Sequence, residues 1–146
     1  MRAQANEKTE GVARPISRHQ DLHVYQYAFD AAFAIFELTK RFPREEQYSL
    51  TDQVRRSSRS VCANIVEAWR KRRYPAAFVS KLADADAEAG ETTFWLDMSL
   101  RCGYLDPVTH SQLSDRYDHI CAQLIRMINS PEKWCIPNAS TRQPPR

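Results

Sequence analysis

Apolar side chains recur every three or four residues through four long stretches of the chain, and this spacing is typical of amphipathic α-helices. The first stretch covers residues 21–41, and its apolar positions are Val24, Ala28, Ala31, Ile35 and Leu38. The second covers residues 48–73, and one face carries Leu50, Val54, Ser58, Val61, Ile65 and Ala68. The pattern predicts a helix in each stretch, with Ser49 or Thr51 available to cap the second.

The third and fourth stretches are bounded by helix-breaking residues. Residues 75–102 carry Phe78, Leu82, Ala85, Ala89, Leu96 and Leu100, and residues 107–130 carry Leu113, Tyr117, Ile120, Leu124 and Met127. Pro43 ends the first helix, Pro75 fits the first turn of the third, and Gly103 suits a helix end. Asp106 followed by Pro107 is typical of a helix start. Because the connections are short, neighbouring helices must reverse direction, which predicts an all-α, antiparallel up-down four-helix bundle.

Both ends of the chain lack this periodicity. We therefore expect a disordered N-terminal arm at residues 1–20, a four-helix bundle at residues 21–135 and a disordered C-terminal tail at residues 136–146. Hydrophobic residues make up 42% of the chain and charged residues 27%, which suits one globular domain. No apolar run is long enough to span a bilayer and no secretory signal is visible, so we expect a cytoplasmic protein without a membrane partner.

Candidate chemistry for an enzyme or a metal site is sparse. The four cysteines are widely separated, which favours free thiols over a disulfide framework or a zinc site. The acidic residues of the third helix lack the Glu-x-x-His pairs of a di-iron bundle. There is no nucleophile–base pair and no glycine-rich phosphate loop. We expect no catalytic residues, no metal and no cofactor. Antiparallel pairing instead predicts Arg59 beside Glu91 and Arg55 beside Trp95.

One string of residues in the second helix and the turns around it has a specific order and spacing. It reads Phe42-Pro43, Glu45, Glu46, Tyr48, Leu50, Gln53, Arg55-Arg56, Ser60-Val61, Asn64-Ile65 and Glu67, followed after the third helix by Gly103-Tyr104-Leu105. It resembles the bacterial four-helix bundle family that includes proteins encoded in intervening sequences of large-subunit ribosomal RNA genes. Accessory variability proteins of diversity-generating retroelements are relatives of that family. The resemblance spans residues 21–129.

This resemblance implies a homopentamer of antiparallel bundles without known catalytic activity. It also implies a role in binding nucleic acid or a reverse transcriptase. Two places depart from the family pattern. Relatives commonly have Glu-Gly where this chain has Glu67-Ala68, so the closest helix contact there is expected to be looser. Relatives often carry Gly-Ser before Gly90, whereas this chain has an acidic and alanine-rich run at residues 84–88.

Basic residues of the second helix form the candidate nucleic-acid surface. They are Arg55, Arg56, Arg59, Arg70, Lys71, Arg72 and Arg73. Cations at a helix C-terminus also complement the helix dipole and remain solvated, so this structural role stays open beside phosphate contact. A ring would repeat the patch and turn weak contacts into avidity. The net charge of +3 adds little to either interpretation. The patch indicates non-specific binding of RNA or DNA.

Two further stripes support assembly. Gln53, Arg56, Ser60, Asn64, Glu67 and Lys71 share a polar face of the second helix, which favours a structural hydrogen-bond network over a ligand site. Phe29, Phe33 and Phe36 form a second apolar stripe on the first helix. Stacking of single-stranded bases is one use of such aromatics, but a subunit interface fits them better. The alternative function is therefore a protein-assembly adaptor, for example an accessory subunit of a retroelement reverse transcriptase.

Overall fold

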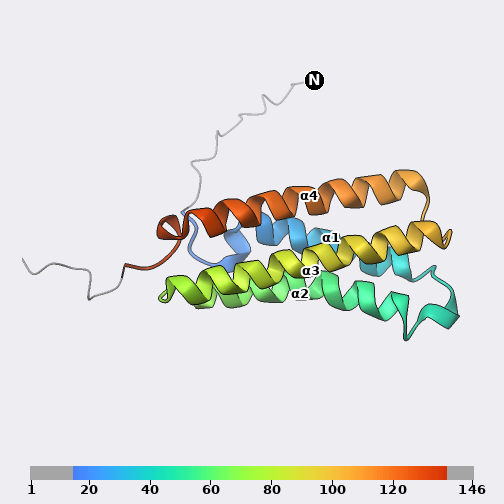
Figure 1. Cartoon of the computed structure of the whole chain (residues 1–146), viewed down its shortest axis with the longest axis horizontal. Helices are drawn as coiled ribbons and strands as arrows, with labels where there is room; N and C mark the ends of the chain where they lie inside the picture. Colours follow the sequence, from blue (N-terminus) through green and yellow to red (C-terminus); the bar gives the residue numbers. More distant parts are fainter. Residues whose placement is uncertain (1–14, 138–146) are drawn as a thin grey trace, which may run out of the picture.

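Four long helices form the protein in the computed structural model, which describes residues 15–137 (Figure 1). They are α1 (His23–Thr39), α2 (Leu50–Arg70), α3 (Pro75–Arg101) and α4 (Pro107–Asn129). Three single turns of 3-10 helix flank them: η1 (His19–Asp21), η2 (Arg44–Glu46) and η3 (Pro131–Lys133). The described residues include no strand. The all-α four-helix fold predicted from the sequence is confirmed.

Residue pairs across the helix contacts show the direction of each helix. The hydroxyl groups of Ser57 in α2 and Thr92 in α3 are hydrogen-bonded. Further along α2, Glu67 forms an ion pair with Lys81, which lies earlier in α3 than Thr92. Positions later in α2 therefore contact positions earlier in α3, so the two helices are antiparallel. Figure 1 shows the same reversal at each connection, with the four helices side by side along one long axis. Each helix packs against the two neighbours that enclose a common core.

Helix ends follow the local chemistry of the chain. The Asp106 carboxylate accepts a 2.8 Å hydrogen bond from the Thr109 backbone N–H, so it caps α4 as its sequence context predicts. Gly103 has a φ of 78°, the left-handed conformation that lets the chain leave α3. The predicted end of the second helix was wrong by three residues. Because α2 ends at Arg70, the cations at residues 71–73 lie in the α2–α3 turn.

The core contains the apolar stripes predicted from the periodicity. Only Leu38 and Leu100 among those positions are partly exposed. The stripes did not reveal the buried polar residues Thr92 and Ser99, whose hydroxyls donate to the backbone carbonyl four residues earlier, at 2.8 and 2.7 Å. Such bonds satisfy a hydroxyl within its own helix, so small polar residues enter the core at low cost.

Most of the predicted N-terminal arm and C-terminal tail falls outside the described residues. Residues 1–14 and 138–146 lie outside the described part of the structure. The predicted boundary at residue 21 falls inside η1. Within the described residues, no helix combines the length and apolar character that crossing a membrane requires. The same residues contain no group of three or more His, Cys, Asp or Glu side chains placed to hold a metal ion.

Candidate nucleic-acid interface

The seven predicted cations fall into two groups along α2. Arg55, Arg56 and Arg59 lie in its first half, whereas Arg70 lies at its end and is followed by three cations in the turn. Fifteen residues separate Arg55 from Arg70, which corresponds to about 22 Å along a helix axis. The structure therefore does not bring the seven side chains together on one surface.

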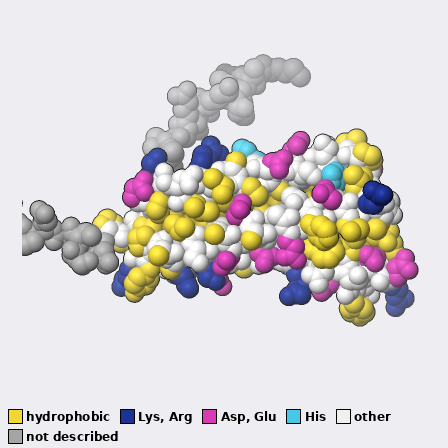
Figure 2. Space-filling model, viewed as in Figure 1, with side chains coloured by type: hydrophobic (Ala, Val, Ile, Leu, Met, Phe, Trp, Pro, Cys, Tyr) yellow, Lys and Arg dark blue, Asp and Glu magenta, His cyan; other side chains and the backbone are white. Residues whose placement is uncertain are grey.

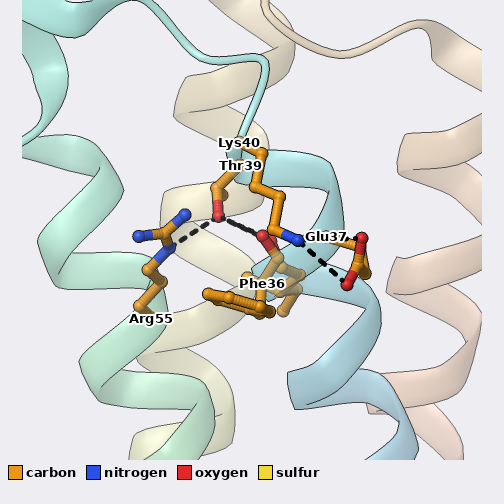
Figure 3. A network of polar contacts seen from close by, with 6 residues as sticks. Phe36, Glu37, Thr39, Lys40 and Arg55 are labelled. Carbon is orange, nitrogen blue, oxygen red and sulfur yellow. Dashed lines mark hydrogen bonds and ion pairs between the residues drawn. The ribbon is translucent and has the colours of Figure 1, made fainter.

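Arg55 of α2 forms a hydrogen bond with α1 (Figure 3). Its Nε donates a 2.8 Å hydrogen bond to the Thr39 hydroxyl, and that hydroxyl donates onward to the Ile35 carbonyl at 2.7 Å. The guanidinium carbon also lies 5.0 Å from the centre of the Phe36 ring. Thr39 is buried, so Arg55 supplies a partner inside the α1–α2 contact. The predicted neighbour of Arg55 was Trp95, but its hydrogen-bond partner is on α1.

Arg56 and Arg59 line a polar pocket of about 420 Å³ between α2 and α3, opposite Glu88 and Glu91. Two carboxylates thus face two guanidinium groups, and the pocket is balanced in charge. Burial raises the pKa of Glu88, with the nearby Glu91 carboxylate raising it further. The predicted neighbours Arg59 and Glu91 line the same pocket, but they form no ion pair in the described structure. The two carboxylates therefore offset the positive charge that would attract an anionic ligand to this pocket.

A different environment surrounds the cations at the far end of α2. A pocket of about 420 Å³ lies between the α2–α3 turn and the segment that precedes α1, and we call it the basic-end pocket. Its lining residues are Ser17, Arg18, His19, Gln20, Trp69, Arg70, Arg72, Arg73 and Ile136. None of these side chains is acidic. Figure 2 shows Lys and Arg side chains around this end of the bundle.

Trp69 holds one wall of the basic-end pocket in place. The Arg72 guanidinium carbon lies 3.4 Å from the centre of the Trp69 ring, and its Nε donates a 2.9 Å hydrogen bond to the Trp69 carbonyl. Burial lowers the pKa of Arg72, but a guanidinium remains charged at neutral pH. Because Trp69 is only 7% exposed, it orients Arg72 and does not serve as a stacking surface for bases.

Charge around the pocket comes from residues with and without protein partners. Arg70 and Arg73 are exposed, and Lys71 is exposed beside them without lining the pocket. Arg18 lies 3.7 Å from the Asp21 carboxylate, which also accepts hydrogen bonds from the backbone N–H groups of Ser17 and Arg18. These bonds lower the pKa of Asp21. Arg70 and Arg73 are therefore the cations most available to an anion.

Sequence reasoning missed Arg18 and His19. They lie about 50 residues from Arg70 and fall within the predicted disordered arm. A signal was nevertheless present: in an antiparallel bundle, the residues before the first helix lie at the same end as the last residues of the second. A basic pair immediately before the first helix was thus placed to meet a basic run at the end of the second.

The residues of the predicted polar stripe of α2 have different kinds of partner along the helix. Asn64 Nδ2 donates to the Ser60 carbonyl at 2.9 Å, which is a bond within the helix. Glu67 forms a 2.8 Å ion pair with Lys81 of α3. Gln53 lines the charge-balanced pocket. The stripe makes one inter-helix pair and several local contacts, and the Glu67 charge is already matched by Lys81.

An aromatic groove lies between α1 and α2, on the same side as Arg59. It encloses about 490 Å³ and is lined by Tyr25, Phe29, Ala32, Phe33, Phe36, Arg59, Cys62, Ala63 and Val66. Phe29 is 53% exposed and Phe33 57% exposed, so two large aromatic side chains contact solvent side by side on α1. The three phenylalanines predicted as an interface thus line one groove.

Comparison with known proteins identifies relatives of this fold. The family model of the 23S rRNA-intervening sequence protein matches residues 20–126. A crystal structure at 1.70 Å from Bacteroides thetaiotaomicron, described as a protein with unknown function from the S23 ribosomal protein family, is 30% identical. The match covers 73% of this chain and 95% of that one, with a TM-score of 0.67. No curated protein matches the chain. The match over most of the folded residues shows that the chain belongs to the 23S rRNA-intervening sequence protein family.

Proposed function

We propose that this protein is a self-associating helical bundle that binds nucleic acid without sequence specificity through the basic-end pocket. The observation that carries the proposal is the composition of that pocket, because four arginines line it and none of its side chains is acidic. The proposal narrows the predicted surface. Arg55, Arg56 and Arg59 have aromatic, hydroxyl or carboxylate neighbours within the bundle, which leaves the cations at the end of α2 for phosphate.

Phosphate is the anion that a nucleic acid presents repeatedly and independently of its sequence. Arginine binds phosphate oxygens through two parallel N–H groups, and two or three such contacts release condensed counterions from the strand. No described element of the bundle is arranged like a helix-turn-helix or a zinc finger, so base readout does not enter the proposal. The predicted binding is therefore weak per copy and strongly dependent on salt.

Self-association would raise the affinity for nucleic acid above the weak binding of a single copy. The exposed aromatic groove on α1 and α2 supports an interface between copies, since large exposed apolar patches mark contact surfaces. The sequence resemblance implies a homopentamer. A ring of that kind would present one basic-end pocket per copy, and simultaneous contacts along one strand multiply the affinity of each.

The test compares two charge-reversal variants. In Arg70→Glu/Arg73→Glu, affinity for a single-stranded RNA oligonucleotide should fall more than about tenfold at low salt, because two phosphate contacts become repulsive. The matched control, Arg44→Glu/Arg116→Glu, reverses two exposed arginines outside the pocket and should change affinity less than about threefold. Fluorescence anisotropy across a salt series measures both. Equal losses in the two variants would show that net charge alone drives binding.

A second function has its own supporting observation. The exposed Phe29 and Phe33 also suit a protein-assembly adaptor, for example an accessory subunit of a retroelement reverse transcriptase. In that case the wild-type protein would be indifferent to RNA at every salt concentration. A purified reverse transcriptase encoded beside this chain would then bind it directly, and Phe33→Arg would abolish that complex.

A further inference from the structure

The outer face of α3 carries an apolar ridge that the bundle itself does not use. Ala83, Ala87, Gly90, Phe94 and Met98 follow at three- and four-residue steps, so they share one face. All five are exposed, including Phe94 at 50% and Met98 at 39%. Figure 2 looks onto α3 and shows hydrophobic side chains gathered over its second half, with acidic side chains beside them. We call this face the α3 ridge.

Gly90 gives an independent indication that something approaches the α3 ridge. A glycine inside a helix costs about 0.5–1 kcal/mol relative to alanine. This cost is usually offset where another segment needs the space of the missing side chain. Nothing in the described protein lies within 4 Å of the place a Gly90 Cβ would occupy. No neighbour among residues 15–137 therefore accounts for the glycine, whereas a closely packed helix from another molecule would.

Charge around the two apolar surfaces is complementary. Glu91 and Asp97 are both exposed and flank Phe94 at three residues on either side, and the Asp97 carboxylate also contacts His110 at 2.7 Å. Arg59 lines the aromatic groove, and Lys40 and Arg55 lie beside the groove around Phe36. The three cations are 5.8, 4.7 and 5.0 Å from the Phe36 ring centre, and Lys40 also pairs with Glu37. The groove thus has a cationic rim and the ridge has acidic flanks. Two grooves placed face to face would instead oppose like charges and leave both ridges uncovered.

We propose that the α3 ridge of one copy seats in the aromatic groove of the next copy, with Gly90 at the closest approach. This rests on the self-association included in the proposed function and names its two surfaces. The convex ridge offers Phe94 and Met98 to a concave groove lined by Phe29 and Phe33. Because the paired surfaces differ, the contact is head-to-tail, which generates a closed ring or an open filament but no two-fold dimer.

The decisive experiment uses one broken surface at a time and measures mass by light scattering. Phe94→Arg breaks the ridge and Phe33→Arg breaks the groove, so each variant alone should be a 16.9 kDa monomer. Mixed together, the two variants retain one intact groove and one intact ridge, and they should form a heterodimer that grows no further. Tyr27→Arg changes an exposed aromatic residue outside both surfaces and should assemble as wild type does. Circular dichroism confirms that each variant folds.

Other outcomes overturn the proposal in distinguishable ways. An assembled Phe94→Arg would show that the ridge is not part of the contact, although self-association itself would stand. Two monomeric variants that do not combine on mixing would exclude the ridge–groove pairing. A monomeric wild type would overturn self-association and the pairing together, and would leave RNA binding by the single bundle as a separate question.

Two substitutions of Gly90 provide a second test, one measured by folding stability and the other by assembly. Gly90→Ala should stabilise the helix of the isolated chain, because alanine restricts the unfolded backbone and finds open space in the fold. Gly90→Leu should fold equally well but dissociate the assembly, because its side chain would occupy the space of the approaching helix. A Gly90→Leu protein that assembles with wild-type affinity would contradict a close approach at this position.

Discussion

The two groups of arginines on α2 are alike in residue type and opposite in environment. Arg55 donates to a buried threonine and lies over Phe36, while Arg56 and Arg59 face Glu88 and Glu91 across a pocket. Arg70 and Arg73, about 22 Å further along the axis, line a pocket without an acidic side chain. The first three cations thus have neighbours on α1 or α3, and Arg70 and Arg73 remain the most available to an external anion.

This contrast teaches that the partner across the helix contact decides what a cation does. α1 places Thr39 and Phe36 against the first half of α2, and α3 places its carboxylates there. At the other end, the nearest acid of α2 is Glu67, and Lys81 of α3 already holds it at 2.8 Å. The segment before α1 adds Arg18 to the pocket, whereas its acid, Asp21, pairs with Arg18 and does not line the pocket. Basic charge accumulates where neighbouring elements place no carboxylate in the pocket.

The largest expected difference between the two groups is in stability. Arg55→Ala should lower the free energy of unfolding by about 2 kcal/mol, because it removes a charged hydrogen bond inside a helix contact and a cation–π contact. Arg73→Ala should change it by less than about 0.5 kcal/mol, since its side chain is exposed. Urea denaturation at equal chain concentration measures both. Similar losses in the two variants would remove the distinction drawn between the groups.

Arg72 is an intermediate case that sharpens the comparison. It stacks on Trp69 and bonds its carbonyl, yet it also lines the basic-end pocket. Arg72→Ala should therefore lower the free energy of unfolding by about 1 kcal/mol and also weaken RNA binding. Arg72→Lys keeps the charge but loses the planar stack, so it should restore binding more than stability. A lysine variant that restores both equally would show that the stack contributes little.

Salt dependence separates phosphate contacts from structural cations. Removing one phosphate contact to a single strand should reduce the slope of log affinity against log salt by about 0.7. We expect this reduction for Arg73→Ala and an unchanged slope for Arg55→Ala, because the Arg55 Nε is held by Thr39. RNA binding titrated by anisotropy at several potassium chloride concentrations gives the slopes. An altered slope in the Arg55 variant would place that residue at the interface.

The smallest effect concerns the ion pair between the two groups. The hydrogen bond and charge of Lys81 lower the pKa of Glu67 from its usual 4.5. A lowered folded-state pKa contributes stability above pH 4.5 that is lost as pH falls through the folded value. Glu67→Gln should therefore be slightly less stable than wild type at neutral pH, and the difference should vanish in acid. Denaturation at both pH values checks this, and a difference that persists in acid would point to a packing effect.

The fold was predictable to within a few residues because local rules and tertiary packing agree. Asp106 caps α4, Gly103 ends α3, and Pro75 begins it, each through backbone chemistry that a short segment determines. Cys62 shows a similar agreement. It was expected to be a free thiol, and in the structure it is a partly buried free thiol whose pKa is raised by burial to about 11. The end of α2 was less predictable, because the basic residues at 71–73 have no local signal that stops a helix.

The candidate site was predicted only in part. The cations at the end of α2 were visible as a run, but their separation from Arg55 depends on what α1 and α3 place against the helix. Trp69 was visible as an aromatic residue, yet its role in orienting Arg72 depends on the turn that follows. The α3 ridge was not predicted, although its positions share one helical face. Its significance depends on the exposure of Phe94 and on the open space beside Gly90 in the described residues.

The sequence by itself determined the four helices, their reversals and the stripe that each buries, because periodicity, prolines and caps act over a few residues. It also determined that basic residues would be concentrated on α2. Tertiary structure alone decided which arginines are matched, because a side chain's partners come from helices distant in sequence. It also brought Arg18 to the end of α2 and left the groove and ridge uncovered. Electrostatic balance and exposure are properties of neighbours in space, so only the packed bundle defines them.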